Sequence, residues 1–125
     1  METTARQQAG SQAENLALDY LQRQKLALVT RNFHVRGGEL DLVMLDDATL
    51  VFIEVRQRAA RGLVSAAESV DGGKQRRLIH AAQCFLASHP QHARRPCRFD
   101  VVAIAHNLGE RRLEWRKNAF EASAY

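Results

Sequence analysis

Apolar and polar positions alternate most clearly between Gly37 and Arg58, in the segment GGELDLVMLDDATLVFIEVRQR. Two runs rich in branched residues flank a polar break at Asp46 to Thr49, which is typical of a β-hairpin with its turn at the break. A symmetric closure pairs residues at equal distances from the turn, and alternation puts four such pairs on one face and leaves the other face wholly apolar. The four pairs are Leu45 with Leu50, Val43 with Phe52, Asp41 with Glu54, and Glu39 with Arg56.

The rest of the chain gives similar signals. Apolar residues at helical spacing predict two helices, and alternation predicts three more strands. The order helix, three strands, helix, strand, strand predicts one α/β domain over residues 1–125, with a mixed central sheet flanked by helices. The expected helices are Thr4 to Lys25 and Lys74 to Ser88, and the expected strands are Leu26 to Val35, Glu39 to Leu45, Thr49 to Arg58, Arg98 to Ala105 and Leu113 to Lys117.

Two carboxylates oppose each other at the open end of the predicted hairpin. Directly opposed side chains in an antiparallel pair have Cβ atoms roughly 4.5–5.5 Å apart, and like charges there are destabilising. Asp41 and Glu54 therefore need a cation between them. A divalent ion such as Mg²⁺ would serve, because it takes carboxylate oxygens, water and substrate phosphates as ligands. The alternative is a solvated strand end at which Arg56 neutralises both acids.

Charge is distributed unevenly around a net value of +4. Residues 1–55 hold five Lys or Arg against eight Asp or Glu, whereas residues 56–98 hold nine against two. Arg accounts for fifteen of the eighteen basic residues, and its planar fork suits bidentate phosphate contacts. A basic stretch beside an acidic pair fits a polyanionic substrate that is steered towards a metal. A merely solubilising surface would show the same composition.

Other features narrow the class of protein. No run of about 18 apolar residues exists and the first residues lack the apolar segment of a signal peptide, so we expect a cytoplasmic protein without a membrane partner. Cys84 and Cys97 lack the spacing of a zinc site or a disulfide framework. Residues 59–73 lose periodicity and are basic and glycine-punctuated, which predicts either a flexible flap over a substrate channel or plain disorder.

Several motifs in order resemble a known family. GELDLVM followed by VFIEVR is similar to the PD-(D/E)xK nuclease superfamily, in which an Asp on one strand precedes Glu-x-Lys on the next. With GSQAENLALDYL, SVDGGKQRRLIHAAQCFL, RFDVVAI and WRKNAF, nearly the whole chain resembles the YraN family of small bacterial predicted nucleases, related to Holliday-junction resolvases. The resemblance implies a restriction-endonuclease-like fold with an αβββαβ core.

The resemblance also implies a site. Asp41, Glu54 and the backbone carbonyl of Val55 would hold Mg²⁺ or Mn²⁺, and Glu14 would support the ion or its water. The catalytic set would be Glu14, Asp41, Glu54 and Arg56. Arg56 departs from the pattern, since the superfamily mostly has Lys there and a guanidinium stays protonated at any working pH. From the residues alone, Glu14 is equally a flanking carboxylate that reaches solvent.

The basic residues after the second hairpin strand complete the expectation. We expect Arg58, Arg61, Lys74 and Arg77 to contact nucleic acid, the last two from the first turn of a helix, where backbone amides attract phosphate. The predicted function is a metal-dependent endonuclease acting on DNA, either branched or single-stranded, in a chain that could act as a homodimer. The alternative is a nuclease-fold protein that binds nucleic acid or a protein partner without cutting.

Overall fold

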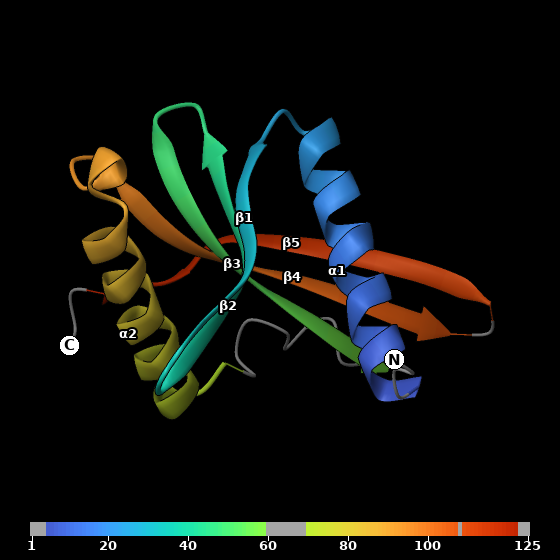
Figure 1. Ribbon diagram of the computed structural model, residues 1–125. Helices are drawn as coiled ribbons and strands as arrows, with labels where there is room; N and C mark the ends of the chain where they lie inside the picture. Colours follow the sequence, from blue (N-terminus) through green and yellow to red (C-terminus); the bar gives the residue numbers. More distant parts are fainter. Residues whose placement is uncertain (1–4, 60–69, 108, 123–125) are drawn as a thin grey trace.

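The computed structural model describes residues 5–59, 70–107 and 109–122, with the side chains of residues 5–10, 58–59 and 106–107 left out of this description. Two α-helices and five strands account for most of these residues (Figure 1). In chain order they are α1 (Ala5–Arg23), β1 (Ala27–Val35), β2 (Gly38–Asp46), β3 (Thr49–Ala59), α2 (Gly72–Ser88), the short 3-10 helix η2 (Pro90–His92), β4 (Cys97–Asn107) and β5 (Glu110–Phe120).

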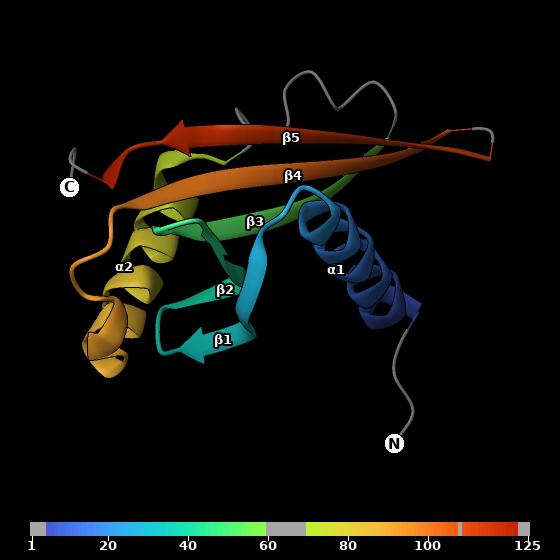
Figure 2. The same cartoon turned by 90° about the horizontal axis from the view of Figure 1, so that it is seen from above.

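The strands form one mixed sheet in the order β1-β2-β3-β4-β5 (Figure 2). Strands β1, β2 and β3 are antiparallel neighbours, β3 and β4 are parallel, and β4 and β5 are antiparallel. The parallel pair is joined through α2, because parallel strands need a long crossover connection. The predicted α/β class and the restriction-endonuclease-like αβββαβ order are confirmed, with β5 added at the edge.

The two helices cover opposite faces of the sheet (Figure 1). Leu42 and Ile53 pack in the apolar cluster under α1, whereas their sequence neighbours Val43 and Phe52 pack in the cluster under α2. This separation follows from the alternation of side chains along a strand. The helices contribute stripes at helical spacing, namely Ala13, Ala17 and Leu21 from α1 and Leu78, Ala81, Ala82 and Phe85 from α2.

The predicted hairpin register holds from the turn as far as Leu42 and Ile53. Val43 with Phe52 and Leu45 with Leu50 pair as expected. The ladder ends there and does not include the expected pairs that would have brought Asp41 opposite Glu54 and Glu39 opposite Arg56. That part of the prediction is wrong, because β2 and β3 are no longer paired beyond Leu42 and Ile53, on the side away from the turn.

Packing against α2 explains why β2 leaves its partner strand. Gly38 lies so close to the helix that a Cβ there would clash with the backbone carbonyl oxygen of Arg77. Leu40 accordingly packs in the cluster under α2 and does not share the face of Leu42, which corrects the expectation of one continuous apolar face. The turn before β2 is completed by Gly37, whose φ of 89° lies in the left-handed region that glycine tolerates.

Helix α2 starts earlier than the sequence indicated. The side chain of Asp71 caps it by accepting a hydrogen bond from the backbone N–H of Lys74 at 2.8 Å, and Gly72 is the first helical residue. Ala59 belongs to β3, so the predicted loop 59–73 is shorter at both ends. Residues 60–69, the rest of that prediction, lie outside the described residues.

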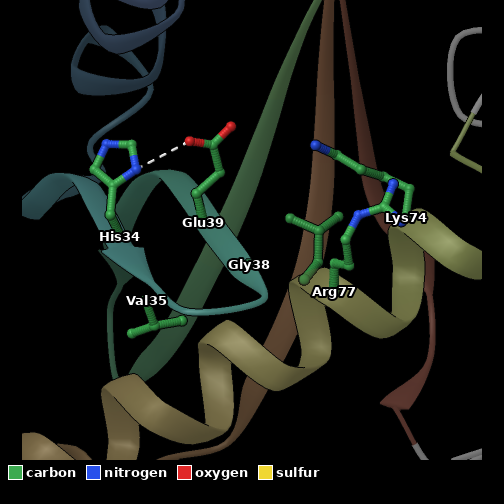
Figure 3. Close-up of a pocket in the computed structure, with 7 residues that line it drawn as sticks. His34, Val35, Gly38, Glu39, Lys74 and Arg77 are labelled. Carbon is green, nitrogen blue, oxygen red and sulfur yellow. Dashed lines mark ion pairs between the residues drawn. The ribbon is translucent and has the colours of Figure 1, made fainter.

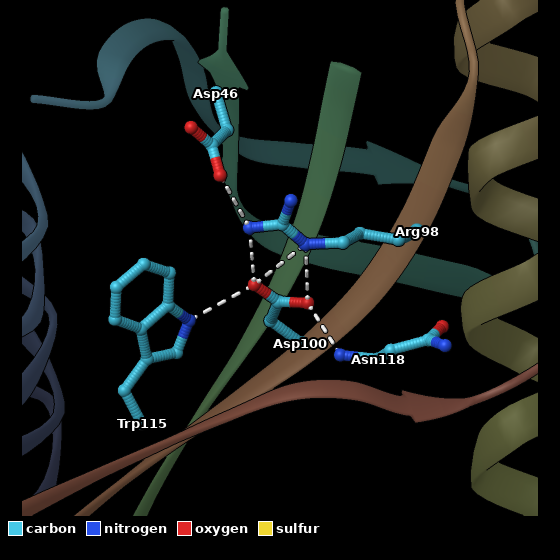
Figure 4. Close-up of polar contacts among 5 residues, drawn as sticks. All are labelled: Asp46, Arg98, Asp100, Trp115 and Asn118. Carbon is cyan, nitrogen blue, oxygen red and sulfur yellow. Dashed lines mark hydrogen bonds and ion pairs between the residues drawn. The ribbon is translucent and has the colours of Figure 1, made fainter.

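A buried carboxylate fastens β5 to β4 (Figure 4). Asp100 is 1% exposed, and the β4–β5 register shifts around it. Its oxygens accept hydrogen bonds from Arg98 Nε at 3.0 Å, Trp115 Nε1 at 2.9 Å and the backbone N–H of Asn118 at 2.9 Å. Arg98 also pairs with Asp46 at 2.9 Å. Asp100 is therefore a structural residue that supplies the acceptors a bulged strand would otherwise lack.

Neither helix in the described part of the chain combines the length and apolar character needed to cross a membrane.

Candidate metal and catalytic site

The candidate site lies where β2 and β3 diverge. Beyond the last ladder pair, the backbone N–H of Val55 donates to Asp41 Oδ2 at 2.8 Å. A side chain of β2 thus replaces the backbone acceptor that a continued ladder would provide, so Asp41 points towards β3. This arrangement brings its carboxylate next to the residue before Val55, which is Glu54.

The Glu54 side chain is almost completely buried, with 7% of its surface exposed. Burial, the negative charge of Asp41 and a hydrogen bond to the Asp41 carboxyl raise the pKa of Glu54 to about 8, against an ordinary value of 4.5. The nearby charges of Lys74 and Arg56 act in the opposite direction. Near neutral pH the Glu54 carboxyl therefore keeps its proton.

Lys74 reaches the same place from α2. Its Nζ lies 3.3 Å from Glu54 Oε2, although no hydrogen bond to that buried oxygen is formed among the described residues. The first turn of α2 is held firmly by the Asp71 cap and by a 2.8 Å hydrogen bond from Gln75 Nε2 to the Val70 carbonyl oxygen. The predicted contact of Lys74 with phosphate stays a prediction. What the structure shows is that the Lys74 amine lies beside the carboxyl group of Glu54.

Glu14 reaches the site from α1. Arg31 Nη2 on β1 lies 3.4 Å from Glu14 Oε1, and the amide nitrogen of Asn32, when turned towards Glu14, donates to both carboxylate oxygens at 3.0 and 3.3 Å. Burial and the charge of Asp41 nevertheless raise the pKa of Glu14. The acidic residues thus form a row between the two helices, from Glu14 to Asp41 and on to Glu54.

The predicted arginines differ in how close they lie to Asp41 and Glu54. Arg56, half-buried on β3, is near enough for its charge to favour the ionised form of Glu54. Arg77 is exposed on α2 and does not contact the carboxylate pair through any described hydrogen bond or ion pair. The Arg58 side chain and the whole of Arg61 lie outside the described residues, so their contacts with nucleic acid stay predictions.

Two adjacent carboxyl groups such as those of Asp41 and Glu54 are compatible with a divalent cation. Glu54 Oε2 is a buried oxygen without a hydrogen bond among the described residues, and ligation by a dication would replace the proton that Glu54 keeps. Within the described ranges, no three His, Cys, Asp or Glu side chains form a ready-made metal site. Two carboxylates and a backbone carbonyl are sufficient for Mg²⁺, which usually keeps several waters.

The model of an uncharacterised protein family, UPF0102, matches residues 13–104, a range that contains Glu14, Asp41, Glu54 and Lys74. The chain belongs to the UPF0102 family. A UPF0102 protein of Pseudomonas putida (strain W619) is 56% identical over 115 residues, which cover 90% of this chain and 93% of the relative. A UPF0102 protein of Pseudomonas syringae pv. syringae (strain B728a) is 50% identical over 123 residues, covering 98% and 100%.

A third relative, a UPF0102 protein of Alcanivorax borkumensis, is 50% identical over 117 residues, covering 93% of this chain and 94% of the relative. These matches confirm the resemblance to the YraN family, which is UPF0102. They extend over nearly the whole chain, including the segments that contain Glu14, Asp41 and Glu54.

Two residues at the candidate site were not anticipated from the sequence. Arg31 and Asn32 hold the Glu14 carboxylate, yet the sequence indicated only that they alternate in a strand. Asn32 has a φ of 55°, which Asn tolerates better than most residues. The strand also contains Thr30 and His34, so the sequence carried no signal that singled out Arg31 and Asn32.

Proposed function

We propose that this protein is a metal-dependent nuclease that hydrolyses phosphodiester bonds in DNA. The observation that carries the proposal is the contact between the carboxyl groups of Asp41 and Glu54, one of them buried with a pKa of about 8. Strongly perturbed titratable groups in contact are typical of functional sites. The membership of the UPF0102 family supports the fold that such a site needs but states no activity.

Asp41, Glu54 and the backbone carbonyl of Val55 are the groups proposed to hold Mg²⁺ or Mn²⁺. The bound ion would polarise the phosphate and lower the pKa of a coordinated water. The protein's own contribution is to hold both carboxylates in place. The N–H of Val55 orients Asp41, and Lys74 attracts the ionised form of Glu54.

The remaining charges are suited to the reacting phosphate. Arg56 keeps its proton at working pH and would stabilise negative charge that builds on the phosphate in the transition state. The Lys74 amine, 3.3 Å from Glu54, is the second cation that a bound phosphate would meet. Glu14, held by Arg31 and Asn32, would act as a positioning residue through a water of the ion.

Binding of DNA without cleavage is the second candidate function, and Arg56 favours it. A guanidinium cannot remove a proton from the attacking water, and the only lysine in the described site is already paired with Glu54. In that case the acidic row and its cations would serve a nuclease-like fold that recognises branched or single-stranded DNA. The two candidates make different predictions for the same purified protein.

The decisive experiment incubates the protein with junction, flap, single-stranded and duplex DNA in Mg²⁺ or Mn²⁺. Asp41→Asn and Glu54→Gln remove one charge each and preserve side-chain shape. Asp47→Asn is the matched control, because Asp47 is an exposed acid in the hairpin turn with a φ of 52°, a conformation that Asn also tolerates. We expect cleavage by the parent and by Asp47→Asn, and loss of at least about a hundredfold in the two site variants.

Calorimetry with Mn²⁺ gives an independent measurement of the ion. We expect heat of binding for the parent and for Asp47→Asn, and none for Asp41→Asn. Cleavage that survives both site substitutions would refute the assignment of the site. DNA binding with neither metal heat nor cleavage would favour the second candidate function.

A further inference from the structure

A cavity of about 300 Å³ lies between the end of the β1–β2 hairpin and the first turns of α2 (Figure 3). His34 and Glu39 stand on the hairpin side, and Lys74 and Arg77 stand on the helix side. Val35 and Leu78 add apolar surface. None of the proposed metal ligands lines this cavity, so it is a space next to the proposed metal site and distinct from it.

Lys74 joins the cavity to the carboxylate site. Its side chain lines the cavity, and its Nζ lies 3.3 Å from Glu54 Oε2. Glu39, on the other wall, is two residues before Asp41 on β2. A group that occupies the cavity would therefore lie next to a phosphate at the carboxylate pair, one short step along a nucleic-acid strand.

Contacts to the backbone set the spacing of the two cavity walls. Gly38 packs directly on the backbone of α2 at Arg77, which sets the spacing of hairpin and helix. His80 of α2 contacts the carbonyl oxygen of Arg36 in the hairpin turn through Nε2 at 3.0 Å. The His34 and Glu39 side chains are held together at 3.1 Å. A preorganised cavity costs little ordering when it binds.

The chemistry of the walls matches one nucleotide. Arg77 and Lys74 can take a phosphate or, for Arg, stack on a base, and an imidazole offers a second stacking surface. Glu39 provides acceptors for N–H groups on a base edge. A space of this size takes a single small ligand and cannot take a base pair with its backbones. The base must therefore be unpaired.

Resting on the proposed function, we infer that this cavity binds one unpaired nucleotide next to the cleaved phosphate, so that the substrate is DNA with a single-stranded segment at the cut. Fully paired DNA offers no base to the cavity, because extruding one costs a few kcal/mol of unpairing. Selection of the substrate by its DNA structure is the consequence.

The test compares two arginines of the same helix. Arg77 lines the cavity and Arg76 does not, although both are exposed, so Arg77→Ala and Arg76→Ala change net charge equally. Fluorescence anisotropy in EDTA measures binding of a paired duplex and of the same duplex with a short single-stranded gap. We expect Arg77→Ala to weaken binding of the gapped DNA at least about fivefold more than Arg76→Ala does, with equal effects on the paired duplex. Equal effects of the two variants on both DNAs would overturn the inference.

A crosslinking experiment locates the base without relying on a variant. A gapped duplex with 5-iodouracil at the unpaired position is irradiated in the complex, and the modified peptide is mapped. We expect attachment at His34 in the parent and its loss when the same base is paired. Attachment elsewhere in the described chain would also overturn the inference.

Competition with a free nucleoside monophosphate shows whether the cavity binds a nucleic-acid strand or a mononucleotide. We expect it to compete only weakly with the gapped DNA, and competition at equal concentration would replace the strand by a mononucleotide and overturn the inference. Every arm is measured without metal, so absence of cleavage would sink the proposed nuclease function and leave this binding result standing. Conversely, metal-dependent cleavage with no preference for gapped DNA would sink only the inference.

Discussion

Replacing Glu54 by Gln should make the protein more stable at neutral pH, in contrast to most substitutions of buried residues. Glu54 has an ordinary pKa of 4.5 in the unfolded chain and a pKa of about 8 in the folded protein. Between these values the folded protein keeps a proton that the unfolded chain has released, so the free energy of unfolding falls as pH rises. The stabilising effect of the neutral carboxyl is complete below pH 4.5 and is lost as pH passes 8.

The size of the effect follows from the same two pKa values. Each pH unit in this window lowers the free energy of unfolding by about 1.4 kcal/mol. At pH 7 the parent has therefore lost about 3 kcal/mol through Glu54 alone. Gln keeps the shape of a protonated carboxyl and does not titrate. The Glu54→Gln protein should match the parent near pH 4.5 and exceed its stability by up to about 3 kcal/mol at pH 7.

Urea unfolding in EDTA at pH values from 5 to 8 measures this difference. Glu110→Gln is the control, because Glu110 is an exposed acid at the start of β5. A second series with Mg²⁺ should raise the stability of the parent and not that of Glu54→Gln, because an ion that binds only the folded state stabilises it. A difference between Glu54→Gln and the parent that does not change with pH would refute the reasoning, as would a variant that is less stable at pH 7.

Three further substitutions test the framework around the site. Gly38→Ala places a methyl group against a backbone carbonyl oxygen of α2 and should lower the free energy of unfolding in urea by about 1–3 kcal/mol. Gly72→Ala is the control, because a Cβ has room there and stability should not change. Equal effects of the two substitutions would contradict the close packing at Gly38. Asp100→Ala leaves buried donors without an acceptor and should cost about 3 kcal/mol or more in the same assay; a cost below about 1 kcal/mol would remove its structural role. Lys74→Met removes a positive charge that favours the ionised form of Glu54, so the pKa of Glu54 should rise when it is measured by NMR titration of the carboxyl group. An unchanged pKa would show that Lys74 and Glu54 do not pair in solution.

The hairpin could be predicted from sequence only as far as local rules act on it. A polar break between branched runs fixes the turn, and the turn fixes the pairs up to Leu42 with Ile53. What happens beyond that point depends on Gly38 meeting α2, a contact between segments far apart in the chain. Alternation carries no information about that contact, so it extended the ladder too far.

The site was predictable to a similar extent. Asp41 and Glu54 were found because acidic residues stand where strands should be apolar, and Glu14 because its motif resembles a family pattern. The position of Lys74 beside Glu54 could not be predicted, since helical periodicity gives the face of a residue and not the strand that it reaches. Arg31 and Asn32 were missed for the same reason. They lie on β1 and contact Glu14 on α1, and alternation along a strand does not show which helix residue a side chain meets.

The failure of the hairpin rule and the origin of the site have one cause. If the ladder continued, the N–H of Val55 would pair with a backbone carbonyl, and the Asp41 side chain would stand out from the face of the sheet. Because β2 turns towards α2, that N–H takes the Asp41 carboxylate, at 2.8 Å, and draws it onto Glu54. Two acidic groups are then held together by backbone that packing elsewhere has already fixed, and the raised pKa of Glu54 is the consequence. An unfavourable arrangement kept at one point of an otherwise regular fold is the kind of feature that motivates the proposal of a functional site there.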